Sequence, residues 1–185
     1  FGGTKSTGLE NAADGNGYGN FYDTPPSGFL SICSANIPID TDIDPSETDN
    51  DVPTKQFGVV TITGNATART ISGLGFQPDF IWAHRRDGGQ RNYLVDSNRG
   101  FTKYLHSEDT YSEGTSSDGI TAATSDGFDI GGTGNLDYIN ANTATYVAWC
   151  WRANGGTTST NTSGTITTTV QANQAAGFSI VTYAG

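Results

Sequence analysis

Residues 57–83 read FGVVTITGNATARTISGLGFQPDFIWA, and this stretch decides the fold class. In its first part, Phe57–Thr63, the residues alternate in the period-two pattern of a half-buried strand. Gly64-Asn65 is a turn signal, strand-forming residues resume at Ala68–Ile71, and Phe80–Ala83 is a short apolar run. Short strands separated by turn residues at this spacing predict a β-sandwich.

The rest of the chain continues this pattern. We predict five further strands, at Tyr93–Asp96, Gly127–Ile130, Tyr146–Arg152, Gly164–Val170 and Phe178–Tyr183. Phe101–His106 fits either a short helix or another strand. Strong helix formers are scarce, with no Met among 185 residues, whereas Thr, Gly and aromatic residues are abundant. The sequence therefore predicts an all-β fold and argues against a helical bundle.

The chain is acidic, with 19 Asp and Glu against 9 Lys and Arg, and its net charge at pH 7 is −10. Contacts to phosphates need clustered Lys and Arg, so we expect no nucleic-acid partner. No apolar run approaches the roughly 18 residues that span a bilayer, so we expect no membrane insertion. Two cysteines, Cys33 and Cys150, are a weak framework for a disulfide, and we favour free thiols over one long-range bridge.

Composition divides the chain into four parts. Residues 1–39 are rich in Gly and Asn and resemble the C-terminal part of a preceding β domain. Residues 40–55 are acidic and contain prolines, which is the composition of an extended linker. We interpret residues 56–155 as one sandwich repeat unit and residues 156–185 as a Thr-rich connector that leads into the first strand of a following repeat. We expect the chain to be a piece of a longer protein, because it starts at Phe1 and contains no Met.

An internal repeat links two of the predicted strands. Residues 57–64, FGVVTITG, align without gaps with residues 178–185, FSIVTYAG, and share Phe, Val, Thr and Gly. One interpretation is that the second segment opens another copy of the same unit. The alternative is that both segments are simply favourable strand sequence.

One segment of this acidic chain is basic and aromatic. Arg85, Arg86 and Arg91 stand close in sequence to Trp82 and Tyr93. Guanidinium groups beside aromatic rings can hold acidic sugars or anionic surface polymers through charge-assisted hydrogen bonds and ring stacking. These five residues are our candidate binding residues for a glycan or an anionic polymer.

The alternative for these arginines is ordinary ion pairing, with Asp79, Asp87 and Asp96 as partners. Two further tryptophans, Trp149 and Trp151, are two positions apart on one predicted strand, so they share a face. An exposed pair of indole rings would suit a sugar ring. The apolar neighbours in the same strand favour the interior, so we expect both tryptophans in the core.

The sequence specifies no catalytic or metal-binding motif. It contains no nucleophile elbow, no His-Glu-x-x-His, no Cys-x-x-Cys and no phosphate-binding loop, so we predict no catalytic residue, no metal and no cofactor. The segments Asp40–Asp51 and Gly131–Asp137 match calcium loops only in part. Glycosidase carboxylates leave no local signature, which keeps Glu108, Asp109 and Glu113 open as residues of a polysaccharide depolymerase.

Several segments are distinctive in their order and spacing. They are Gly73–Trp82, Asp96–Gly100 with Lys103–Leu105, Ser125–Phe128, Tyr146–Ala153 and Gly177–Tyr183. Together they resemble a repeated domain of structural proteins of marine bacteriophages, described as tail-fibre or virion-fibre proteins. The opening residues Gly15–Asn36 are similar to the closing strands of a lectin-like jelly-roll domain. The resemblance implies a lectin-like, jelly-roll β-sandwich module with partial neighbouring modules at both ends.

The resemblance also implies a function in a virion. We expect a non-enzymatic structural module of a tail fibre that takes part in host attachment and lies on the tail or capsid surface. The expected partners are further copies of the chain in a homotrimer, other virion proteins and a host surface glycan. Two alternatives stay open, a capsid decoration or head-fibre protein and a tail-associated polysaccharide depolymerase.

Overall fold

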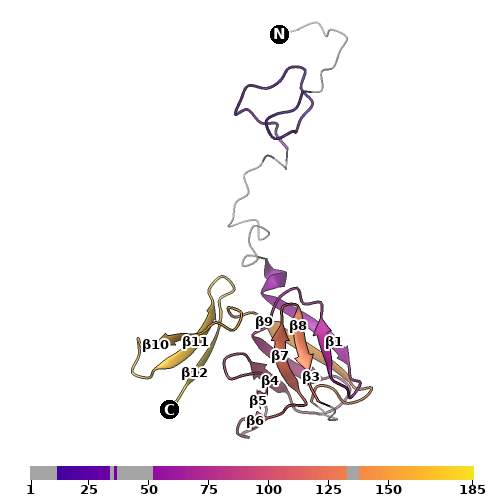
Figure 1. The fold of residues 1–185 in the computed structure, drawn as a ribbon, viewed down its shortest axis with the longest axis vertical. Helices are drawn as coiled ribbons and strands as arrows, with labels where there is room; N and C mark the ends of the chain where they lie inside the picture. The colour runs from indigo at the N-terminus through magenta and orange to yellow at the C-terminus, as the bar shows by residue number, and fades with distance from the viewer. Residues whose placement is uncertain (1–11, 34–35, 37–51, 133–137) are drawn as a thin grey trace. The chain divides into compact units, whose positions relative to one another are not determined.

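The computed structural model describes residues 12–33, 36, 52–132 and 138–185. The chain divides into two compact units, Phe1–Asp44 and Pro45–Gly185 (Figure 1). Regular structure in the described residues is almost entirely antiparallel β-strand, so the predicted all-β class is confirmed. No helix in these residues has both the length and the apolar character needed to cross a membrane.

The first described element of the second unit is one turn of 3-10 helix, Pro53–Lys55, and strands follow it. In chain order the strands are β1 (Phe57–Thr63), β2 (Arg69–Ser72), β3 (Phe80–Arg85), β4 (Tyr93–Asp96), β5 (Lys103–Leu105), β6 (Gly114–Thr115), β7 (Ile120–Thr124), β8 (Gly127–Ile130), β9 (Thr145–Trp151), β10 (Ser159–Asn161), β11 (Thr168–Asn173) and β12 (Phe178–Tyr183). The predicted bounds of β1, β4, β8 and β12 are confirmed, and Phe101–His106 contains a strand rather than a helix.

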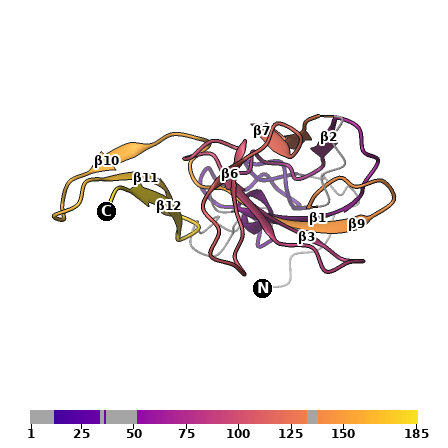
Figure 2. The ribbon, with the colours of Figure 1, turned by 90° about the horizontal axis from the view of Figure 1, so that it is seen from below.

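Two sheets form a sandwich. One has six strands in the order β1-β9-β3-β4-β5-β6, and the other has three in the order β2-β8-β7. Figure 2 shows β2 and β7 on one side of β1, β3 and β9. Strands β1 and β2 are consecutive in sequence but belong to different sheets, so the segment between them carries the chain from one layer to the other.

The core lies between these two sheets. Ile81, Tyr93 and Val95 point inward from the six-stranded sheet, and Phe128 and Ile130 meet them from the smaller sheet. All five side chains are at most 1% exposed. Full burial of a large apolar side chain contributes about 1.5–3 kcal/mol, so this cluster is a main source of stability. Cys150 also lies in the core, and both it and Cys33 are free thiols, as predicted.

A third sheet, β10-β11-β12, packs beside the sandwich, and one buried carboxylate is bonded to both. Asp79 is 0% exposed and accepts hydrogen bonds from the backbone N–H groups of Ala153 (2.6 Å), Gly155 (2.9 Å) and Gly156 (2.7 Å). The amide of Gln171, on β11, donates to the same carboxylate at 2.7 Å. Several donors compensate the buried charge, and they tie the loop after β9 and the third sheet to the start of β3.

The first unit is organised around Asp14, which is 7% exposed. Its carboxylate accepts hydrogen bonds from the backbone N–H groups of Ser31 (2.8 Å) and Tyr18 (2.9 Å) and from the side chain of Asn36 (2.6 Å). These bonds, that from the Ser31 backbone first, hold the pKa of Asp14 well below its usual range. Most of the predicted acidic linker, residues 40–55, and residues 1–11 lie outside the described residues.

Candidate functional site

Trp149 and Trp151 lie on the outer face of the six-stranded sheet. Strand β9 alternates strictly, so Tyr146, Ala148 and Cys150 are fully buried while both tryptophans are half-buried. The prediction that the two rings belong to the core is therefore wrong. The side chains alternate with the expected period of two, but Tyr146, Ala148 and Cys150 face the core instead of the tryptophans.

Trp82 on β3 joins these two rings. Its neighbours Ile81 and Ala83 are fully buried, so Trp82 points to the outer face. Trp82 stands opposite Trp149 in the β3–β9 register, and their rings meet edge to face with centroids 6.0 Å apart. Trp82, Trp149 and Trp151 line a shallow pocket of about 290 Å³. We call these three residues the tryptophan face.

Trp151 is held by aromatic neighbours. Its ring centroid lies 4.9 Å from that of Phe57 on β1 and 5.4 Å from that of Phe80 on β3. Phe178, at the start of β12, stacks on it at 6.0 Å with 21° between the ring planes. These contacts fix the orientation of Trp151 before any ligand binds.

Trp82 is held by a polar network. Its indole N–H donates to Oδ1 of Asn92 at 3.0 Å, and Asn92 donates through its backbone N–H and its side chain to Glu108, at 3.0 Å in each case. His106 Nδ1 donates to the carbonyl of Asn92 at 2.6 Å. Burial raises the pKa of Glu108, but hydrogen bonds from Asn92 and Ser107 outweigh it and leave this pKa below its usual value.

An apolar band extends the tryptophan face across the sheet. The register places Val59 opposite Trp149, and Leu94 on β4 lies between Trp82 and Leu105 on β5. Val59 is 49% exposed and Leu105 is 38% exposed. An apolar surface that continues across several strands in this way is a candidate binding surface.

The predicted binding arginines lie at the end of β3 and in the loop that follows it. Arg85 forms an ion pair with Asp87 at 2.8 Å, and Arg91 forms one with Asp109 at 2.8 Å. Arg91 also covers the ring of Tyr111 at 4.5 Å from its centroid. The alternative of ion pairing is therefore confirmed for these two arginines, with Asp87 as a predicted partner and Asp109 as an unpredicted one.

Arg86 and Tyr93 occupy very different places. Arg86 is exposed, and within the described part of the chain its guanidinium forms no ion pair. Tyr93 is 0% exposed, and its ring stacks against those of Tyr104 (5.0 Å) and Tyr138 (6.2 Å). Burial raises the pKa of Tyr93. Tyr93 thus cannot touch a surface ligand, because β4 turns it inward together with Val95.

The candidate carboxylates of a depolymerase are all engaged in structural contacts. Glu108 supports Asn92, Asp109 pairs with Arg91, and Glu113 accepts from Arg99 at 3.0 Å. The Arg99 bond, with help from Lys103, lowers the pKa of Glu113. A glycosidase acid needs a raised pKa, so the lowered values at Glu108 and Glu113 argue against that role. The two segments that partly match calcium loops lie outside the described residues, apart from Gly131 and Gly132.

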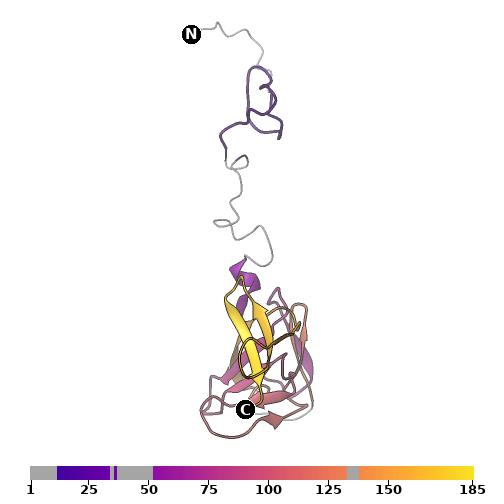
Figure 3. The same cartoon turned by 90° about the vertical axis from the view of Figure 1, so that its left-hand side faces the viewer.

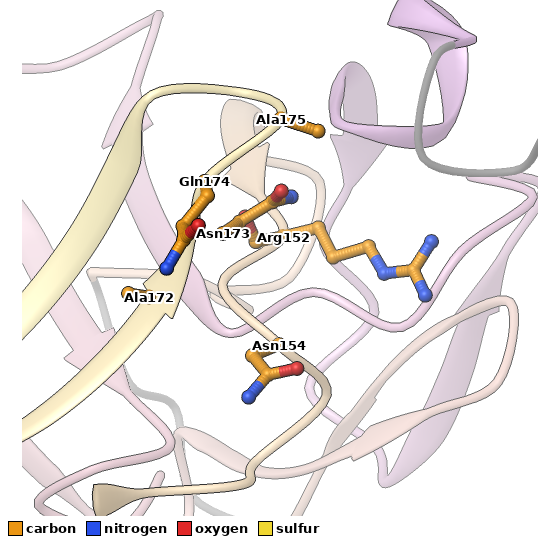
Figure 4. A pocket seen from close by; sticks show the side chains of 6 residues that line it. All are labelled: Arg152, Asn154, Ala172, Asn173, Gln174 and Ala175. Atoms are coloured by element: carbon orange, nitrogen blue, oxygen red, sulfur yellow. The ribbon is translucent and has the colours of Figure 1, made fainter.

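A second pocket, of about 300 Å³, lies where the loop after β9 meets β11. It is lined by Arg152, Asn154, Ala172, Asn173, Gln174 and Ala175. Figure 4 shows that the guanidinium of Arg152 points away from Asn154 and Gln174, so the polar groups do not converge. Asn173 is already used, because its side chain donates to Gln56 and to the carbonyl of Arg152. This pocket therefore lies at the contact between the sandwich and the third sheet.

The tryptophan face is thus the best-formed candidate site, and only Trp82 among its residues was predicted as a binding residue. No curated protein and no solved structure matches the chain. Residues 52–185 match the family described as Domain of unknown function (DUF7483). This match runs from the first turn of the second unit through β12, so it includes both the sandwich and the third sheet. The chain therefore belongs to the DUF7483 family.

Proposed function

We propose that this protein is a non-catalytic module of a phage fibre that takes part in host attachment by binding a host surface glycan on the tryptophan face. The observation that carries the proposal is the row of half-buried indoles, Trp82, Trp149 and Trp151, around one shallow apolar pocket. The resemblance to phage fibre domains supplies the setting, and the pocket supplies the binding chemistry.

The chemistry of the pocket suits a sugar ring. A pyranose presents a face of C–H groups that can lie on an indole, while its hydroxyl groups stay at the rim and reach water or polar side chains. Trp82 is fixed by Asn92 and Trp151 by Phe57, so little ordering is required when a ligand binds. A shallow site of this kind is expected to bind weakly, and a multimeric fibre gains strength by engaging several sites at once.

The state of the nearby carboxylate Glu108 favours binding of a glycan without its cleavage. Glu108 is committed to Asn92, and its pKa is lowered rather than raised. A depolymerase would release reducing ends from a host polysaccharide, so the absence of such release at high protein concentration is the expected result.

The experiment is a binding assay against an array of neutral and acidic bacterial envelope polysaccharides, read by quenching of tryptophan fluorescence and by calorimetry. We expect at least one polysaccharide to bind, and Trp149→Ala to weaken that binding by roughly fivefold or more, since stacking on one aromatic side chain contributes about 1–3 kcal/mol. Tyr111→Ala is the control, because Tyr111 is an exposed aromatic residue outside the pocket. Equal losses in the two variants would contradict a site on the tryptophan face.

Location on the particle tests the other half of the proposal. Gold-labelled antibody raised against residues 56–155 is expected to mark the tail periphery of intact virions. Label confined to the capsid would contradict host attachment and favour a decoration or head-fibre protein.

A further inference from the structure

The C-terminal part of this acidic protein has no charged side chain. From Ala153 to Gly185 the sequence contains no Asp, Glu, Lys, Arg or His, although the whole chain has a net charge of −10. All three strands of the third sheet lie within this neutral stretch. Two copies of the chain repel one another wherever their acidic surfaces meet. The third sheet is neutral, so two copies can approach one another there without this repulsion.

The third sheet has one covered face and one open face. Gln171 is 0% exposed and Asn173 is 8% exposed, so this side of β11 is buried at the sandwich. The other side carries Val170 opposite Val181 and Thr168 opposite Tyr183. Val181 is 47% exposed and Tyr183 is 69% exposed. In Figure 3 the yellow strands lie in front of the sandwich, and no other described element covers the side that faces the viewer.

The sequence match between β1 and β12 allows the open face of β12 to be compared with the corresponding face of β1. In the alignment of residues 57–64 with 178–185, Val181 corresponds to Val60 and Tyr183 to Ile62. Val60 packs against the core and Ile62 is 5% exposed, since the smaller sheet covers that side of β1. The same strand pattern is therefore covered by a sheet in β1, whereas no described element covers it in β12.

Strand β12 is an edge strand of the third sheet among the described residues, where it pairs only with β11. Exposed edge strands of soluble proteins usually carry Lys, another charge or Pro, which prevent pairing with a second chain. Strand β12 reads FSIVTY and has none of these.

We infer that the open face of the third sheet, with Val170, Val181 and Tyr183 at its centre, docks against a second copy of this chain. Two neutral sheets then pack face to face and bury apolar side chains, while the acidic surfaces of the two copies stay apart. The inference goes beyond glycan binding and holds whether or not the tryptophan face binds a sugar.

The test is the molar mass of the full 185-residue chain by light scattering after size exclusion, up to about 200 µM, where an interface with a Kd of about 10 µM is largely formed. We expect a mass of at least twice the 19.4 kDa of one chain. Val181→Glu and Tyr183→Glu are each expected to return the protein to that single-chain mass, with an unchanged circular dichroism spectrum. Higher salt should strengthen association of the unsubstituted chain, because it screens the repulsion between the acidic copies.

Val59→Glu is the matched control. Val59 is the same residue type on another edge strand and is 49% exposed, but it lies beside the tryptophan face. We expect it to leave the mass of the assembly unchanged. A single-chain mass for the unsubstituted protein at all concentrations overturns the inference. So does dissociation by Val59→Glu without dissociation by Val181→Glu, which would place the contact on the six-stranded sheet.

Discussion

Replacement of Asp79 by Asn should destabilise the second unit far more than the loss of one charge at a surface. Asp79 is 0% exposed, and its two carboxylate oxygens have different partners. Oδ1 accepts from the backbone of Gly156 and the side chain of Gln171, and Oδ2 accepts from the backbone of Ala153 and Gly155. Asn has one carbonyl oxygen, so its amino group must face one of these two sets of donors.

The magnitude follows from the donors that lose their acceptor. In either orientation of the Asn side chain, at least two buried or partly buried N–H groups are left facing another donor. Each such group costs about 1–3 kcal/mol, which predicts a loss of about 2–6 kcal/mol in the free energy of unfolding. A domain of this size has about 5–15 kcal/mol in total, so Asp79→Asn removes a large fraction of it.

The assay is urea unfolding followed by circular dichroism, together with amide hydrogen exchange. Asp126→Asn is the matched control, since Asp126 also accepts hydrogen bonds from two backbone N–H groups, those of Gly73 (3.0 Å) and Gly75 (2.6 Å), but at a partly exposed position. Water can replace those bonds, so we expect a loss of at most about 1 kcal/mol there. In Asp79→Asn, amides of β11 and β12 should lose protection before those of β3 and β9. The reasoning is refuted if both variants lose the same stability, or if the third sheet keeps its protection in Asp79→Asn.

Two smaller predictions concern a close backbone approach and one ion-paired carboxylate. A Cβ at Gly64 would lie 2.0 Å from the carbonyl oxygen of Ala141, so Gly64→Ala should lower stability in urea by about 1–3 kcal/mol, whereas Gly89→Ala, with nothing within 4 Å, should change it by less than about 0.5 kcal/mol; equal changes would contradict the close approach. The hydrogen bond from Arg99 and the charge of Lys103 lower the pKa of Glu113 from 4.5, so Glu113 stabilises the fold above its unfolded pKa and loses this contribution as the pH falls through the lower folded value. The stability of Glu113→Gln should therefore fall slightly less below pH 4.5 than that of the unsubstituted chain, and the difference should be under about 1 kcal/mol. If stability falls equally in both proteins as the pH is lowered, Glu113 does not have this role.

The strands that sequence alone predicted well are those where apolar alternation is bounded by turn residues. Phe57–Thr63 and Tyr93–Asp96 have this form, and their bounds match β1 and β4. Strand β7 reads ITAAT and β10 reads STN, so neither has enough apolar alternation to stand out from a loop. Each pairs with the strand that follows it, β7 with β8 and β10 with β11, and this backbone pairing forms the strands without an apolar alternation that a local pattern could show.

The candidate site was harder to predict because sequence gives the period of a strand but not which phase faces the core. In β9 the small residues and Tyr146 occupy the core, which turns the larger Trp149 outward. In β4 the opposite occurs, and Tyr93 is buried although it follows a basic segment. The prediction grouped Tyr93 with the arginines because they are close in sequence. In the structure the register of β3 and β9 instead brings Trp82 beside Trp149, which is far from it in sequence.

The pairing of β1 with β9 has a consequence for synthesis of the chain. Phe57 pairs with Trp151, and the side chain of Gln56 accepts from Asn173, 117 positions later. Strand β1 therefore leaves the ribosome long before its partner, and at about 5–20 residues per second it waits roughly 4–20 s for β9. During this time its apolar side chains are available to chaperones or to neighbouring nascent chains. Translation that stops before Trp151 leaves β1 without its partner, so such truncated products are expected to aggregate rather than to accumulate as a smaller folded domain.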